Sequence, residues 1–181
     1  LKTRVIGVPK TIDGDMKNRE IETSFGFDTA AKTYAELIGN ICRDAQSSVK
    51  YWHFVRLMGR AASHITLECA LQTGPNIALI SEEVQAQNLS LSAVVDQLVE
   101  VILRRYHAGK KYGIILVPEG LPEFIPEIKT LIAELGHILG ENDRAGLKHV
   151  AGLPSHEDRI QFLNKRLSDH SARVYGQLPG D

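Results

Sequence analysis

The feature that most constrains this chain is an alternation of short apolar runs with longer segments of helical periodicity. The apolar runs occupy residues 5–8, 52–57, 77–80 and 113–117. Between them, apolar residues recur every three or four positions, as on one face of an amphipathic helix. Strands that alternate with helices favour an α/β fold, here a mostly parallel sheet with flanking helices.

The helical segments carry recognisable start and stop signals. Helical periodicity covers residues 27–42, 65–71, 94–106, 126–135 and 157–167. We expect Thr23 or Ser24 to cap the first of these helices and Ser63 to cap the second. Gly74, followed by Pro75, should end the second helix, and Pro126 suits the first turn of a later one.

The pattern divides the chain into two parts. Residues 1–140 read as an α/β core, whereas residues 141–181 are weakly patterned and are expected to form a largely helical extension. The chain starts at Leu1 rather than at a methionine, and a strand follows with no lead-in. Residues 176–181 end in a loop-like run. We therefore expect this chain to be a middle portion of a longer protein.

Composition excludes several classes of function. The formal net charge of the 181 residues is −1, which gives no basis for binding nucleic acid or an anionic membrane. No apolar run reaches the roughly 18 residues of a membrane span. Cys42 and Cys69 lie among apolar residues of helical segments, so we expect two reduced, buried thiols. A cytoplasmic location follows as the default.

Ligands of parallel α/β sheets bind beyond the carboxyl ends of the strands. This rule selects the loops at residues 9–18, 58–60 and 118–121. The first loop contains Lys10, Thr11, Asp13, Gly14 and Asp15. An aspartate can accept the proton of an attacking alcohol, and a lysine can bind phosphate oxygens, which together suit phosphoryl transfer. Asp and Gly also favour plain polar turns, so composition alone leaves both interpretations open.

The other two loops are ambiguous when taken alone. Arg60, next to Gly59, could bind a sugar phosphate or lie on a surface turn. Glu119 could accept hydrogen bonds from sugar hydroxyls or belong to an ordinary turn, and Glu82 with Glu83 is equally open. The seven histidines show no metal-ligand spacing, so we expect each to be structural or at the surface.

Taken in order, these segments resemble the phosphofructokinase family. Residues 10–15 are similar to its catalytic loop, and Met58-Gly59-Arg60 to its sugar-phosphate loop. Residues 50–60, 62–72 and 115–120 resemble the long, pyrophosphate-using branch. The resemblance covers roughly residues 4 to 135, and the ordered set is far more specific than any one triplet.

The resemblance implies a role for each matching position. Asp13 would be the general base, and Thr11 would help position the transferring phosphoryl group. Ile12 would help bind the substrates, and Asp15 would support Asp13 or a magnesium-bound donor. Met58, Gly59 and Arg60 would contact fructose 6-phosphate, and Glu119 would bind its hydroxyls. Lys50 and Tyr51 match a place where the family reaches substrate across a subunit interface, which implies a homo-oligomer of at least two full-length subunits.

The phosphoryl donor depends on Lys10. The resemblance implies that ATP-using members have glycine here, whereas lysine marks pyrophosphate users. A lysine ammonium can hold the leaving phosphate, and its bulk would crowd a nucleotide. The implied reaction is reversible, glycolytic transfer from pyrophosphate to the 1-hydroxyl of fructose 6-phosphate. An ATP-dependent enzyme and a non-catalytic regulatory subunit are the alternatives.

The resemblance also implies Mg²⁺ as cofactor. The family's donor loop, which holds the main magnesium ligand, would lie upstream of Leu1, so the metal-ligating residues are unknown from this chain. We expect the 181 residues in isolation to be inactive because that loop and neighbouring sheet elements are missing.

Overall fold

The fold is built on three parallel strands. A computed structural model describes residues 3–16, 18–140, 155–168 and 171. Its sheet has the order β1-β3-β2, where β1 is Trp52–Leu57, β2 is Ile77–Ala78 and β3 is Gly113–Pro118. Strand β1 pairs with β3 along its whole length, and both pairings are parallel. This arrangement confirms the predicted α/β class with a parallel sheet.

Strand β3 lies at the centre because it can be buried on both faces. Ile114, Ile115 and Leu116 are at most 3% exposed. A continuous apolar run of this kind is typical of a parallel strand covered by helices on both sides. Because β3 lies between β1 and β2, the loops after β1 and β3 meet at one edge of the sheet.

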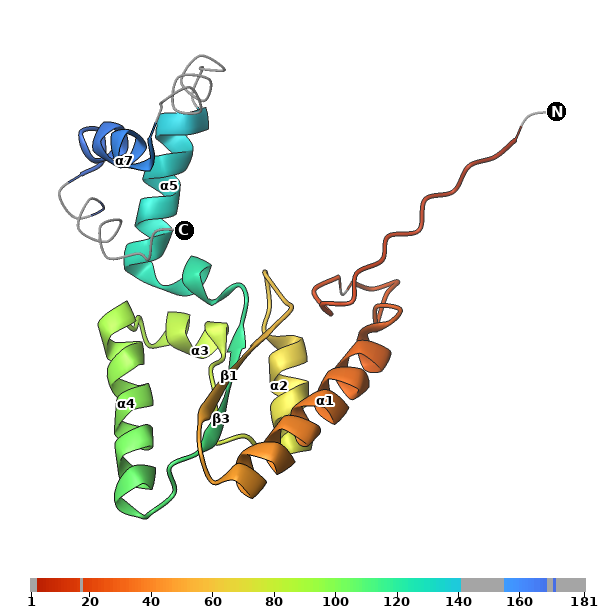
Figure 1. The fold of residues 1–181 in the computed structure, drawn as a ribbon. Coiled ribbons are helices and arrows are strands. Elements are labelled where there is room, and N and C mark those ends of the chain that lie inside the picture. Colours follow the sequence, from red (N-terminus) through yellow and green to blue (C-terminus); the bar gives the residue numbers. More distant parts are fainter. Residues whose placement is uncertain (1–2, 17, 141–154, 169–170, 172–181) are drawn as a thin grey trace.

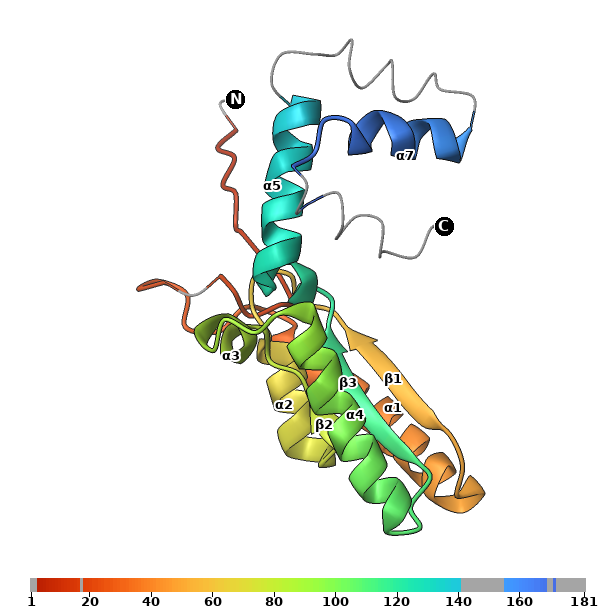
Figure 2. The same ribbon diagram turned by 90° about the vertical axis from the view of Figure 1, so that its left-hand side faces the viewer.

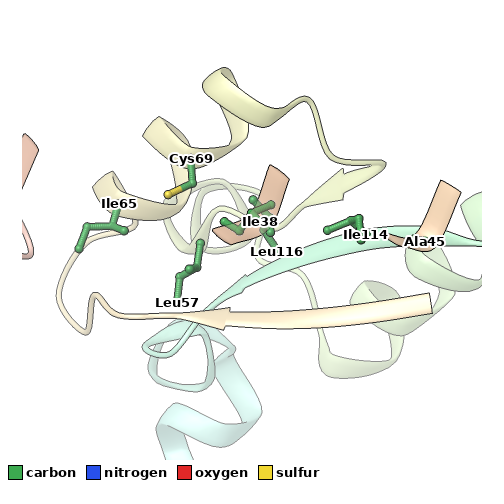
Figure 3. Close-up of a cluster of buried hydrophobic side chains, with 7 residues drawn as sticks. All are labelled: Ile38, Ala45, Leu57, Ile65, Cys69, Ile114 and Leu116. Atoms are coloured by element: carbon green, nitrogen blue, oxygen red, sulfur yellow. The ribbon is translucent and has the colours of Figure 1, made fainter. Parts of the chain in front are cut away.

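Two helices cover one face of the sheet. Helix α1 (Phe27–Ser48) and helix α2 (His64–Thr73) lie side by side on the same side of β1 and β3 (Figure 1). Their buried side chains meet those of the two strands in one apolar cluster (Figure 3). The cluster consists of Ile38, Ala45, Leu57, Ile65, Cys69, Ile114 and Leu116.

The other face is covered by α4 (Leu91–His107), with the short α3 (Ser81–Ala86) beside it (Figure 1). Val84 and Val94 from these helices pack against Leu79 and Leu121 in a second cluster. Beyond β3 the chain forms a 3₁₀ turn (Leu121–Phe124) and then α5 (Pro126–Gly140). Helix α7 (His156–Asn164) lies beside α5 (Figure 2), and Leu163 of α7 and Leu167 just after it pack with Leu131 of α5 in a third cluster.

The expected helix caps were only partly right. The N-cap of α1 is Gly26, not Thr23 or Ser24, because the Ser24 hydroxyl bonds to the backbone of Thr11 instead. Ser63 occupies the N-cap position of α2 but makes no side-chain cap; its hydroxyl accepts a hydrogen bond from the Ser81 amide. Gly74 ends α2 in the left-handed conformation, as predicted.

Two strand predictions need correction. Residues 5–8 form no strand, and Val5, Ile6 and Val8 are at least 80% exposed, since no described strand pairs with them. A strand is stable only where a neighbour satisfies its backbone groups. The predicted strand at residues 77–80 pairs with β3 only over Ile77–Ala78, with one further hydrogen bond from the Leu79 amide. The chain then enters α3, a helix that the periodicity did not predict.

The remaining predictions concern the thiols and the extension. Cys42 and Cys69 are free; Cys69 is buried and Cys42 is partly buried. Within the described ranges, no helix has both the length and the apolar character needed to cross a membrane. Helix α7 confirms helical structure within residues 157–167. Residues 141–154 and the loop-like tail at 176–181 lie outside the described residues.

Candidate active site

The three loops selected from the sequence gather at the carboxyl edge of the sheet. The loops after β1 and β3 leave the same end of two paired strands, and residues 9–16 pass close to the first turns of α1 and α2 (Figure 1). The candidate side chains Asp13, Arg60 and Glu119 therefore come from three separate segments of the chain. This is the edge at which parallel α/β sheets bind ligands.

Backbone hydrogen bonds join the loops after β1 and β3. The Glu119 amide donates to the Leu57 carbonyl at 2.8 Å, and the Gly120 amide donates to the Gly59 carbonyl at 3.1 Å. Both glycines are required by geometry. Gly59 has φ +123°, and a Cβ there would lie 2.6 Å from the Ala62 carbonyl oxygen. A Cβ on Gly120 would overlap the backbone of Arg60.

The first loop is held by the segment that precedes α1. The Thr11 amide donates to Ser24 Oγ at 3.1 Å, and the Ser24 hydroxyl donates back to the Thr11 carbonyl. The Asp13 amide donates to Thr11 Oγ1 at 3.3 Å, which folds the loop into a tight turn. Thr11 is therefore occupied in shaping the loop that presents Asp13.

A histidine holds the same loop from α2. His64 Nδ1 lies 3.0 Å from the Gly14 carbonyl oxygen, one residue after Asp13. Gly14 has φ +74°, a conformation that favours glycine. A Cβ on Gly14 would come within 3.0 Å of the Phe27 ring, so the loop lies close against α1 as well.

Lys10 lies at the beginning of α1. A Cβ built on Gly26, the N-cap residue, would lie 3.8 Å from Lys10 Nζ and 3.3 Å from Ile12 Cγ2. Gly26 therefore leaves room for both side chains over the first turn of the helix. A helix N-terminus carries partial positive charge, so the exposed ammonium and the helix end together favour an anion.

Electrostatics single out Asp13 among the carboxylates. Partial burial raises the pKa of the Asp13 carboxyl, and the negative charges of Asp15 and Glu119 raise it further. Lys10 opposes this effect and lowers the pKa of Asp13. A carboxylate whose pKa is raised toward the working pH is a better proton acceptor.

The loop after β1 carries Arg60 and Met58, whose side chains have different surroundings. Arg60 Nη2 is 3.3 Å from Glu123 Oε1, but the two side chains are 75% and 51% exposed. Such an exposed ion pair is weak, so an anionic ligand can replace Glu123 at the guanidinium. Met58 Sδ accepts a hydrogen bond from the Tyr34 hydroxyl at 3.0 Å, which ties its loop to α1.

Lys50 and Tyr51 are not brought into this group. They lie just before the amino end of β1, about 23–26 Å along the chain direction from Met58 at about 3.3 Å per residue. Both are exposed, and Tyr51 has φ +70°. Within one chain they are remote from Asp13.

Sequence reasoning missed the residues that support the loops. Ser24 binds the Thr11 backbone rather than capping a helix, His64 contacts the Gly14 carbonyl, and the Tyr34 hydroxyl contacts Met58. The position of His64 just after the Arg60 loop was the one available signal. In the described part of the chain, no group of three His, Cys, Asp or Glu side chains is arranged to hold a metal ion.

Comparison with known proteins gives a consistent result. The family model described as phosphofructokinase matches residues 1–168. The pyrophosphate–fructose 6-phosphate 1-phosphotransferase of Porphyromonas gingivalis is 56% identical over 178 residues, which is 98% of this chain and 32% of that protein. The β subunit of the same-named enzyme of Ricinus communis is 64% identical over 181 residues, 99% of this chain and 30% of that protein.

An α subunit of this enzyme from Arabidopsis thaliana is also similar. It is 48% identical over 177 residues, which is 98% of this chain and 26% of that protein. The chain thus spans less than a third of the length of the curated relatives it matches.

Proposed function

Since this chain belongs to the phosphofructokinase family, we propose that the full-length protein transfers a phosphoryl group from pyrophosphate to the 1-hydroxyl of fructose 6-phosphate. The products are fructose 1,6-bisphosphate and phosphate, and the reaction is reversible. The names of the relatives from Porphyromonas gingivalis and Ricinus communis support this reaction. One observation carries the proposal: the loops that contain Asp13, Arg60 and Glu119 lie together at the carboxyl ends of the strands.

Asp13 is proposed as the general base. It takes the proton of the sugar 1-hydroxyl as the new oxygen–phosphorus bond forms and the bridging oxygen–phosphorus bond of pyrophosphate breaks. Its raised pKa supports this role, because proton transfer is most efficient when the pKa of the base approaches the working pH. Asp15 raises that pKa, and Thr11 shapes the turn that presents Asp13.

The sugar is assigned to the loops after β1 and β3. Arg60 would exchange its exposed partner Glu123 for the phosphate of fructose 6-phosphate, with Met58 and Gly59 beside it. Glu119, which lies close enough to Asp13 to raise its pKa, would accept hydrogen bonds from sugar hydroxyls. Positioning of this kind accounts for much of the rate enhancement in phosphoryl transfer.

Lys10 is proposed to bind the leaving phosphate. Its ammonium lies beside the N-terminal turn of α1. The charge of the ammonium and the partial positive charge of the helix N-terminus together favour a compact, highly charged anion such as pyrophosphate. An ATP-dependent reaction is less favoured, since Lys10 and the relatives' names point to pyrophosphate. A non-catalytic regulatory subunit is less favoured because Asp13, Asp15 and Arg60 are all present.

Mg²⁺ is the proposed cofactor. Asp13, Asp15 and Glu119 offer the oxygen ligands that this ion prefers, but they form no metal cluster by themselves. Asp15 would support an ion bound to the pyrophosphate donor, and the main protein ligand of that ion is unknown from this chain. The metal would neutralise charge on the donor. Activity should disappear with a chelator and return with added Mg²⁺.

The full-length protein is proposed to be a homo-oligomer of at least two subunits in the cytoplasm. Lys50 and Tyr51 are exposed and remote from their own Asp13, so any contact with substrate would have to be made in a second subunit. Some of the relatives are named as α or β subunits, which supports an assembly of more than one chain. Sedimentation of the full-length protein as a monomer would contradict the oligomer, and cell fractionation tests the location.

The donor is tested by a coupled assay on the full-length protein with fructose 6-phosphate and Mg²⁺. Pyrophosphate and ATP are supplied in separate reactions. We expect turnover with pyrophosphate and little with ATP, and we expect Lys10→Gly to weaken pyrophosphate use. Turnover with ATP alone would overturn the donor. Silence with both donors would favour the regulatory subunit.

A further inference from the structure

The loop that carries Asp13 and Asp15 has no regular secondary structure of its own. Its shape depends on hydrogen bonds to other segments, and two of these flank Asp13. Ser24 holds Thr11 on one side, and His64 holds the Gly14 carbonyl on the other. The position of the Asp13 carboxylate therefore depends on both contacts.

The contact from His64 faces an open space. A cavity of about 320 Å³ lies behind the loop, and Gly14, Phe27, His64 and Leu67 are among its lining residues. Gly14 also has a positive φ, and glycine adopts many alternative backbone conformations at low cost. Without the hydrogen bond from His64, the peptide group that carries the Gly14 carbonyl has both the conformational freedom and the space to shift toward the cavity.

The backbone next to His64 is fixed by hydrogen bonds to α3. The preceding residue, Ser63, is 1% exposed; its amide donates to Glu82 Oε1 at 2.9 Å, and its hydroxyl accepts from the Ser81 amide at 2.9 Å. Burial works to raise the pKa of Glu82, but the hydrogen bonds from Ser63, the backbone amide of Glu82 itself and the nearby His64 together lower that pKa. The start of α2 is thus joined to α3 by a charge-assisted hydrogen bond, which fixes the backbone from which the His64 side chain extends.

We propose that His64 is a positioning residue, whose Nδ1–H donates to the Gly14 carbonyl and thereby sets the place of the Asp13 carboxylate. The inference rests on the proposed phosphotransferase function, because it assigns His64 a part in that reaction. The carbonyl can only accept, so Nδ1 must carry the proton. His64 does not touch the reacting atoms in this arrangement.

The test compares three replacements in the full-length protein. His64→Leu fills the space without a donor, His64→Ala removes the ring, and His64→Asn places an amide N–H near the position of Nδ1. We expect kcat to fall about fivefold to tenfold in His64→Leu and His64→Ala, as for the loss of one hydrogen bond. His64→Asn should recover most of kcat, and KM for fructose 6-phosphate should change little in all three.

The control is His107→Asn, which changes an exposed histidine at the end of α4, far from the loop. It should leave kcat unchanged. Parent-like kcat in His64→Leu would overturn the inference, and so would equal losses in His64→Asn and His64→Leu accompanied by a lower melting temperature. If the parent itself fails to use pyrophosphate, the proposed function fails, which this design separates from a failure at His64.

Discussion

Asp13 is a carboxylate held in a place that disfavours its charge. Partial burial and the nearby charges of Asp15 and Glu119 raise its pKa, and the ammonium of Lys10 lowers it. In the unfolded chain these influences are absent. The folded state therefore binds the Asp13 proton more tightly than the unfolded state does, and ionisation of Asp13 at neutral pH costs stability.

The first prediction concerns Asp13→Asn. Loss of the general base should lower kcat by about 100-fold or more. The same change removes a destabilising charge, so the melting temperature at pH 7 should stay equal or rise. Steady-state kinetics and thermal unfolding of the full-length protein check both parts. A variant that keeps parent-like kcat would remove Asp13 from the proposed role.

Asp15 provides a second prediction. Its charge raises the pKa of Asp13, so Asp15→Asn should lower that pKa. Because the base must be deprotonated, the acidic limb of the kcat/KM profile should move to lower pH. Asp96→Asn, an exposed change on α4, is the matched control and should leave the limb in place. A limb that moves upward in Asp15→Asn would contradict the electrostatic account.

At the scale of elements, the site depends on two loops that fit together backbone to backbone. Gly120 lies against Arg60 with no space for a side chain, and its amide bonds to Gly59. The contact sets the separation between the loop at residues 58–60 and Glu119. A change in this contact should therefore affect catalysis as well as stability.

The third prediction is that Gly120→Ala destabilises the protein by about 1–3 kcal/mol and lowers kcat/KM at least tenfold. The added Cβ must push the two loops apart. Gly39→Ala is the control, because a Cβ at this position in α1 meets nothing within 4 Å and alanine favours a helix. Denaturant unfolding and kinetics measure both variants. A neutral Gly120→Ala would show that the loops have more freedom than the structure indicates.

The same scale shows what the sequence could and could not predict. Strand β3 was predictable because a continuous apolar run between polar ends fits only a buried segment. Helix α3 was missed, since six residues are too few for a periodic signal. The run at residues 5–8 has the local pattern of a strand, but pairing depends on a neighbour that local pattern cannot supply. His64 was missed for a similar reason, because its partner Gly14 lies 50 residues earlier.

At the scale of the whole molecule, these 181 residues carry one part of the proposed site. They carry Asp13, Arg60 and Lys10, which we propose as the base, the sugar-phosphate ligand and the phosphate ligand, within the range that the family model matches. They span less than a third of the related enzymes, and apolar side chains such as Val5, Val8 and Phe54 stay exposed. The isolated chain should therefore be inactive while the full-length protein turns over.

Phosphorus NMR of the full-length protein with pyrophosphate, fructose 6-phosphate and Mg²⁺ tests the central claim most directly. The account predicts that the pyrophosphate signal falls while phosphate and a new phosphate ester at C1 of the sugar rise in equal amounts. The Asp13→Asn variant should show almost none of this change. Conversion of pyrophosphate to two phosphates without a new ester, or an unchanged spectrum, would contradict the account.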